Sequence, residues 1–136
     1  MGKNVLSEVH NELCQRGYDV ALMEMFKAIS LQSSLYQTTM LFAFDDDDAS
    51  WNGAKIMSNR LEINKSFSLA QRLFICNQFN KQSEYCSAYL SDDDNEYFMV
   101  SACVSSQCKN FVEMCANMFE EVIEETDFLI DLISEY

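Results

Sequence analysis

The 136-residue sequence contains no proline and only three glycines. These two residue types punctuate most irregular turns and linkers. We therefore expect regular elements joined by short connections, in a single domain over residues 1–136. The three glycines also exclude phosphate-binding loops, because neither a GxGxxG nor a Walker sequence can be written around Gly2, Gly17 or Gly53. We expect no cofactor.

Basic residues are also scarce, since nine Lys and Arg stand against 22 Asp and Glu, for a net charge of −13. That charge disfavours nucleic acid and anionic membrane surfaces, which proteins bind through Lys and Arg. The charge is uneven: residues 53–81 have five basic residues and one acid, whereas residues 105–136 have eight acids and one lysine. Two interpretations stay open. Both segments solvate the fold, or the acidic segment recruits a basic partner.

Long apolar runs are missing as well. No stretch approaches the roughly 20 apolar residues of a membrane span, and the first residues become charged and amphipathic at once, unlike a secretion signal. We therefore expect a cytoplasmic protein, in which cysteines are reduced and behave as small hydrophobic residues. The six cysteines are Cys14, Cys76, Cys86, Cys103, Cys108 and Cys115.

Nothing in the sequence indicates catalysis. The single histidine, His10, lies among polar neighbours in an expected helix, and no local Ser or Cys nucleophile is paired with it. Many carboxylates could act as a general base, but no spacing distinguishes one of them. The sequence therefore predicts no catalytic residue and a protein that is not an enzyme.

Two acidic runs, "DDDDASWNG" from Asp45 and "DDDNE" from Asp92, have the carboxylates that Ca²⁺ prefers. An EF-hand loop also needs Gly at its sixth position and Glu at its twelfth. Those positions hold Ser50 and Ile56 in the first run, and Tyr97 and Cys103 in the second. The cysteines have no CxxC pair for zinc. We predict no metal ligands, although weak divalent-ion binding by the acidic loops stays open.

Apolar spacing predicts three helices. The first covers residues 3–16, with Gly17 as its C-cap. The second begins after Ser66 or Ser68, has an apolar stripe of Leu69, Leu73, Phe74 and Cys76, and ends at Asn77 and Asn80. The third begins at Ser105 or Ser106 and is so long that we expect a bend or a protruding end near Thr126.

Alternation and β-branched or aromatic residues predict five strands, near residues 27–32, 35–44, 54–63, 83–90 and 96–103. The order of elements is then α-β-β-β-α-β-β-α. Short connections between strands indicate a twisted antiparallel five-stranded sheet with flanking helices, in the α+β class.

The last two strands suggest a binding surface. If their alternate residues Cys86, Ala88, Phe98 and Val100 face the helices, the opposite face of the sheet holds other side chains. Tyr and Met are enriched at protein interfaces. The sequence leaves open whether a helix of the same chain or a protein partner covers that face, whose candidate residues are Tyr85, Tyr89, Tyr97 and Met99.

The segment around these strands resembles the YbjN family of bacterial proteins over residues 73–125. "NQFN" at the end of the second helix is followed at the family's spacing by the aromatic and "AYL" pattern of "SEYCSAYL". The sequence departs from the family in its glycine-free turn at 92–95, in "VSSQC" before the last helix, and in having only Lys81 after the asparagines. The residues that carry the resemblance are Asn77, Phe79, Asn80, Tyr85, Ala88, Tyr89 and Leu90.

The resemblance implies a fold similar to type III secretion class I chaperones, with a twisted sheet, three helices and often a homodimer. The family is described as sensory-transduction regulators, and it has no active site to carry over. We therefore expect a non-enzymatic adaptor or chaperone-like regulator that binds a protein partner. The alternative is a small regulatory domain that senses a ligand or divalent ion through its acidic loops. Asn77 and Asn80 have a structural role in either case, because Asn side chains bond backbone groups at helix ends.

Overall fold

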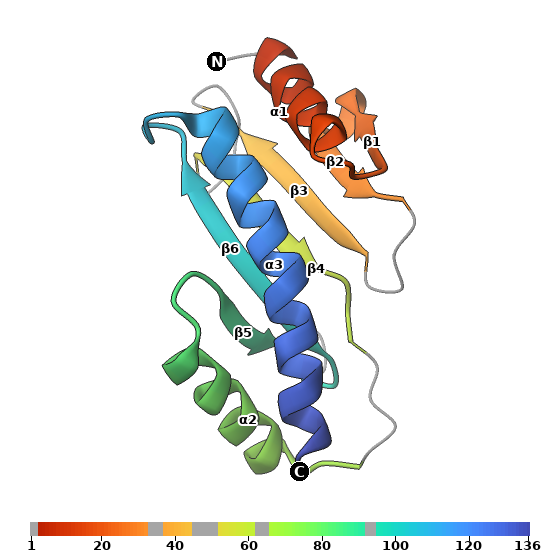
Figure 1. Cartoon of the computed structure of the whole chain (residues 1–136). Helices are drawn as coiled ribbons and strands as arrows, with labels where there is room; N and C mark the ends of the chain where they lie inside the picture. The colour runs from red at the N-terminus through yellow and green to blue at the C-terminus, as the bar shows by residue number, and fades with distance from the viewer. Residues whose placement is uncertain (1–2, 33–36, 45–51, 62–65, 92–94) are drawn as a thin grey trace.

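The computed structural model describes residues 3–32, 37–44, 52–61, 66–91 and 95–136 (Figure 1). Its elements confirm the α+β class. The helices are α1 (Lys3–Gln15), α2 (Leu69–Gln82) and α3 (Phe111–Ser134), with a short 3₁₀ turn η1 (Glu24–Phe26). The strands are β1 (Val20–Met23), β2 (Ala28–Leu31), β3 (Thr38–Ala43), β4 (Gly53–Ser58), β5 (Ser87–Leu90) and β6 (Phe98–Ser105).

The strands form one antiparallel sheet of six, in the order β1-β2-β3-β4-β6-β5, so the expected count of five is wrong. The strand that the sequence did not reveal is β1, in the segment "VALM", whose Ala, Leu and Met favour helices in isolation. It pairs with β2 from Val20 opposite Leu31 to Met23 opposite Ala28. Pairing in the sheet outweighs the local helix propensity there.

The helices lie on one side of the sheet (Figure 1). α1 lies over the β1–β2 end, α3 runs diagonally over β4 and β6, and α2 lies beside β5. The side chains beneath α3 follow the strand register, with Met40 opposite Ile56 and Ile56 opposite Ala102, and all three are buried. Because strand side chains alternate between faces, the opposite face of the sheet is made by the residues between them.

α3 is an uninterrupted helix of 24 residues, about 36 Å long at the usual rise. It has no break at Thr126, whose hydroxyl donates to the carbonyl of Val122 at 2.6 Å. Its last turns do not protrude either, because Leu129 and Ile133 are buried and Phe128 packs on Phe79 of α2 with ring centroids 5.6 Å apart. The helix also starts later than predicted, since β6 extends through Ser105. No helix in the described part of the chain is long and apolar enough to cross a membrane.

α2 begins after Ser68, one of the two serines predicted to precede it. Ser68 is the N-cap, and it forms a capping box with Gln71, in which each side chain bonds the other residue's backbone N–H, at 3.2 and 2.8 Å. The predicted apolar stripe is wrong in part. Cys76 is buried, but Leu69, Leu73 and Phe74 are about half exposed, and the helix buries Ile75 and Phe79 instead.

The asparagine pair divides into two different roles, because α2 continues past both residues to Gln82. Asn80 bonds the backbone of β5 rather than the helix end. Its side-chain oxygen accepts from the Ala88 N–H at 2.7 Å, and its amide nitrogen donates to the Ala88 carbonyl at 3.1 Å. Since β5 is an edge strand, Asn80 satisfies backbone groups that would otherwise lie open at the edge. Asn77 is exposed within the helix.

Candidate protein-binding surfaces

The face of the sheet opposite the helices is the first candidate surface. In the part of the chain that the structure describes, no helix lies on it (Figure 1). Tyr89 of β5 lies directly opposite Met99 of β6. Met57 of β4 pairs with Ser101 and is thus the diagonal neighbour of Met99. All of these side chains are partly exposed, and together they define the Tyr89–Met99 surface.

Only two of the four predicted binding residues belong to this surface as strand residues. Tyr97 immediately precedes β6, and the guanidinium of Arg60 lies 5.6 Å from its ring centroid. Tyr85 lies in the connection between α2 and β5, because β5 begins only at Ser87, and it is 54% exposed. The structure therefore places Tyr89 and Met99 together, Tyr97 just before the strand that holds Met99, and Tyr85 outside the sheet.

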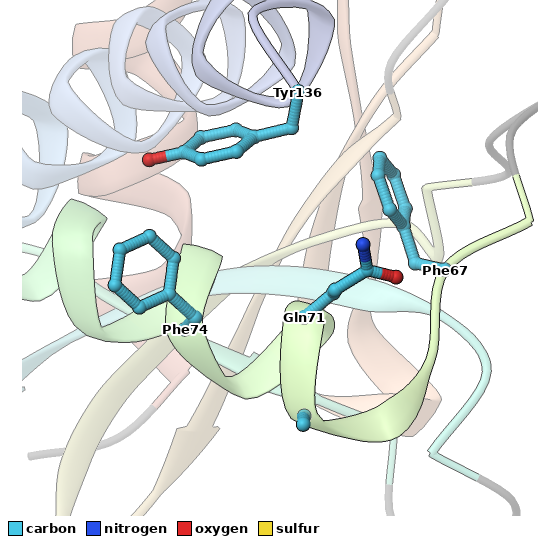
Figure 2. A pocket seen from close by; sticks show the side chains of 5 residues that line it. Phe67, Gln71, Phe74 and Tyr136 are labelled. Atoms are coloured by element: carbon cyan, nitrogen blue, oxygen red, sulfur yellow. The ribbon is translucent and has the colours of Figure 1, made fainter.

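The second candidate surface was not predicted. A pocket of about 220 Å³ lies at the start of α2 (Figure 2), where Phe74 and Tyr136 meet edge to face with ring centroids 5.8 Å apart. Leu69 and Leu73 of α2 add further exposed apolar area. The signal in the sequence was a helix with apolar residues on more than one side, which indicates more than one contact face. The pocket is lined by Phe67, Ala70, Gln71, Phe74 and Tyr136.

A group of carboxylates lies on the middle of α3. Burial, together with the carboxylates of Glu121 and Glu124, raises the pKa of Glu125. The two ion pairs that the structure shows between described residues both involve Arg16, which bonds Glu12 and Glu120 at 3.4 Å each. The carboxylates of Glu121, Glu124 and Glu125 take part in neither pair, so their repulsion is not relieved within the described chain.

The buried cysteines are unsuited to nucleophilic chemistry. Burial raises the pKa of Cys76 to about 11 and that of Cys115 to about 12. For Cys86, burial and the carboxylates of Glu125 and Glu121 raise the pKa to about 12. These thiols stay protonated at neutral pH, whereas the thiolate is the reactive form. All six cysteines are free in the structure.

The single histidine has a structural contact. Nε2 of His10 lies 2.9 Å from the carbonyl oxygen of Val20 in edge strand β1. A carbonyl only accepts, so Nε2 carries the proton and donates it. The Sγ atom of Cys14 lies 3.8 Å from the same nitrogen. A protonated Nε2 cannot act as a base toward that thiol, and this geometry does not form a Cys–His catalytic pair.

The acidic loops lie mostly outside the described residues, because 45–51 and 92–94 are not part of them. Divalent-ion binding by these loops therefore stays a prediction. Among the residues that the structure does describe, no group of three or more His, Cys, Asp or Glu side chains could hold a metal ion.

Comparison with known proteins gave no relatives: no family model matches the chain, and no curated protein and no solved structure matches it. The resemblance to the YbjN family, and with it the chaperone-like fold type, stays a prediction from the sequence.

Proposed function

We propose that this protein is a non-enzymatic cytoplasmic adaptor, chaperone-like and related to the YbjN family, that binds a protein partner through the Tyr89–Met99 surface. The observation that carries the proposal is the placement of all three helices on one side of the sheet. The other side presents adjacent partly exposed Tyr and Met side chains.

The chemistry of this surface suits a protein ligand. Tyr provides a large apolar ring with a polar end, and Met provides a flexible apolar side chain. Both residue types are enriched at interfaces for these reasons. A hydrogen-bonded sheet holds them in fixed positions, so little order is lost when a partner binds. Lys55 of β4 lies on the same face, paired with Cys103 of β6, and adds a cation at its margin.

The proposal is tested by replacing Tyr89 and Met99 together with Ser and comparing the proteins captured from the native host. We expect the double variant to lose the main partner while its unfolding curve stays cooperative. Met25→Ser is the matched control, because Met25 is 90% exposed and lies in η1 at the other end of the sheet. If the double variant captures the same partner as the control, the surface does not bind it.

Ion sensing by the acidic loops is distinguished by thermal unfolding with and without Ca²⁺, Mg²⁺ or Zn²⁺. A specific ion at 100 times its dissociation constant stabilises a folded protein by about 2.7 kcal/mol. An adaptor is expected to show no saturable, ion-specific shift. A shift of that kind would favour the sensor.

The homodimer implied by the family resemblance is tested by a separate measurement of mass. Light scattering gives about 15.7 kDa for a single chain and twice that mass for a dimer. We expect the dimer at micromolar concentrations. A mass that stays at the single-chain value over that range would contradict it.

A further inference from the structure

α2 packs against the second half of α3, and the two helices run antiparallel. We call their line of contact the seam. Phe74 of α2 meets Tyr136, while Phe79, farther along α2, meets Phe128, which precedes Tyr136 in the chain. The apolar pocket lies at one end of this seam, between the start of α2 and Tyr136 (Figure 2). We call the seam with its pocket the α2–α3 groove.

The size of the pocket indicates what it can hold. Pockets that enclose a small-molecule ligand usually measure about 300–1,000 Å³, whereas this one measures about 220 Å³. Its walls are mainly aromatic, and Phe74 and Tyr136 are each 48% exposed. Exposed apolar side chains around a small pocket are typical of a site that receives one anchoring side chain of a protein partner.

Charge lies at the other end of the same groove. Residues three or four apart share a helix face, so Glu121, Glu125 and Phe128 lie in one row along α3, and Tyr136 follows two residues after the helix ends at Ser134. The contribution of both carboxylates to the raised pKa of Cys86 places them near the connection between α2 and β5. Glu125 is about 16 Å from Tyr136 along the helix axis, or three helical turns.

The basic residues of α2 do not neutralise this end of the groove. Arg72 donates to the carbonyl of Asn95 at 2.9 Å, on the β5–β6 connection, and Lys81 takes part in neither of the ion pairs between described residues. α2 has two basic residues, whereas α3 has seven acidic residues from Glu113 to Asp131, with Glu135 just after it and Lys109 before it. The net field over the groove is negative.

We propose that the α2–α3 groove binds an amphipathic helix of a basic protein partner, with an apolar anchor in the pocket and Lys or Arg three turns away beside Glu121 and Glu125. Such a helix presents both groups on one face. A second copy of this chain fits this groove less well, because pairing α3 with α3 here would set the acidic row of one copy against that of the other, and like charges across an interface oppose association. The homodimer expected above would use another surface.

The inference goes beyond the proposed function, because the groove lies on the helix side of the molecule and the Tyr89–Met99 surface on the other (Figure 1). One of the two surfaces could therefore bind a partner even if the other does not. The Tyr89→Ser, Met99→Ser double variant is therefore a control here, and it should bind a groove ligand as tightly as the wild type does.

The probe is a synthetic helical peptide with one Phe and, eleven residues away on the same face, two Lys. Binding to the full chain is measured by fluorescence anisotropy at low and high salt. We expect Phe74→Ala and Ala70→Trp to weaken binding about tenfold, as loss of an anchor does. The first removes a pocket wall, and the second fills the pocket without removing a contact.

The charge requirement is tested with Glu121→Gln combined with Glu125→Gln, against Glu113→Gln at the far end of α3 as the matched control. The double variant should bind several-fold more weakly at low salt and lose most of its salt dependence, whereas the control should bind like the wild type. A peptide with Glu in place of both Lys should bind at least tenfold more weakly than the Lys peptide.

Four results would overturn the inference. The first is equal binding of the Lys and Glu peptides, and the second is binding that neither pocket variant weakens while both still unfold cooperatively. The third is an absence of binding by the wild type at 100 µM peptide, on the order of the weakest useful affinity. Self-association of the wild type that Phe74→Ala abolishes, seen by light scattering, would likewise overturn it and assign the groove to a second copy.

Discussion

At the scale of single residues, Asn80 performs the task that another strand would perform. Its side-chain amide both donates to and accepts from Ala88, which reproduces the pair of bonds between facing strands. Sheet edges are sites of unwanted pairing with other chains. The residue therefore closes the β5 edge at Ala88.

Replacing Asn80 with Ala should reduce the free energy of unfolding by about 1–3 kcal/mol, because each of two hydrogen bonds contributes roughly 0.5–1.5 kcal/mol. Urea unfolding followed by circular dichroism measures the change. Asn77→Ala is the control on the same helix, and it should stay within about 0.5 kcal/mol of the wild type, as exposed substitutions usually do. Equal stabilities of the two variants would show that the Asn80 bonds contribute nothing.

The thiols give a second prediction at this scale. Cys14 and Cys103 are exposed, whereas Cys76, Cys86 and Cys115 are buried and have raised pKa values. Titration of the native protein with a thiol reagent at pH 8 should modify the two exposed cysteines first. The three buried ones should react only at the rate of unfolding. Rapid reaction of more than three thiols in the native protein, counting half-buried Cys108, is the contrary result.

At the scale of elements, the sequence predicted the helices and strands where local and global preferences agree. α1, the β3 strand and the Ser68 cap are such cases. The sequence does not predict β1, because its Ala, Leu and Met are good helix formers. The pairing with β2 that makes this segment a strand does not show in its local pattern. The apolar pattern of α2 does not specify which side meets the core, because the helix is apolar on more than one side.

The candidate surfaces were predictable to a similar extent. Alternation along β5 and β6 placed Tyr89 and Met99 on one face, since it depends only on the period of the strand. Tyr85 falls within the strand predicted at 83–90, whereas β5 begins four residues later, at Ser87. The groove between α2 and α3 depends on Tyr136 reaching Phe74, a contact between residues far apart in the chain that no local pattern specifies.

The acidic row of α3 leads to a prediction about pH. Burial and the carboxylates of Glu121 and Glu124 raise the pKa of Glu125 in the folded chain. A group with a raised folded-state pKa stabilises the fold fully below its unfolded pKa, near 4.3, and that stability is lost as the pH rises through the folded pKa. Glu125→Gln should therefore raise the melting temperature at pH 7.

The same substitution should have almost no effect at pH 4, where Glu125 is largely protonated in the folded protein. Thermal unfolding at the two pH values measures the difference. Asp127→Asn, an exposed position on the same helix, is the control for a general loss of negative charge. An increase in melting temperature that is equal at both pH values, or equal in the control, would show that repulsion at Glu125 does not cause it.

At the scale of the whole molecule, the fold is two-sided. The helices and the core occupy one side of a six-stranded sheet, and α3 spans the molecule from the end of β6 to the start of α2 (Figure 1). The central claim is that the other side of the sheet is a protein-binding surface.

That claim is tested most directly by site-specific photo-crosslinking in the native host. A photoreactive phenylalanine analogue replaces Met99 in one experiment and the highly exposed Met25 of η1 in another. The account predicts one dominant cross-linked partner from position 99, absent from position 25 and lost when Tyr89 is also replaced by Ser. No cross-linked protein from position 99, or the same set of proteins from both positions, would contradict it.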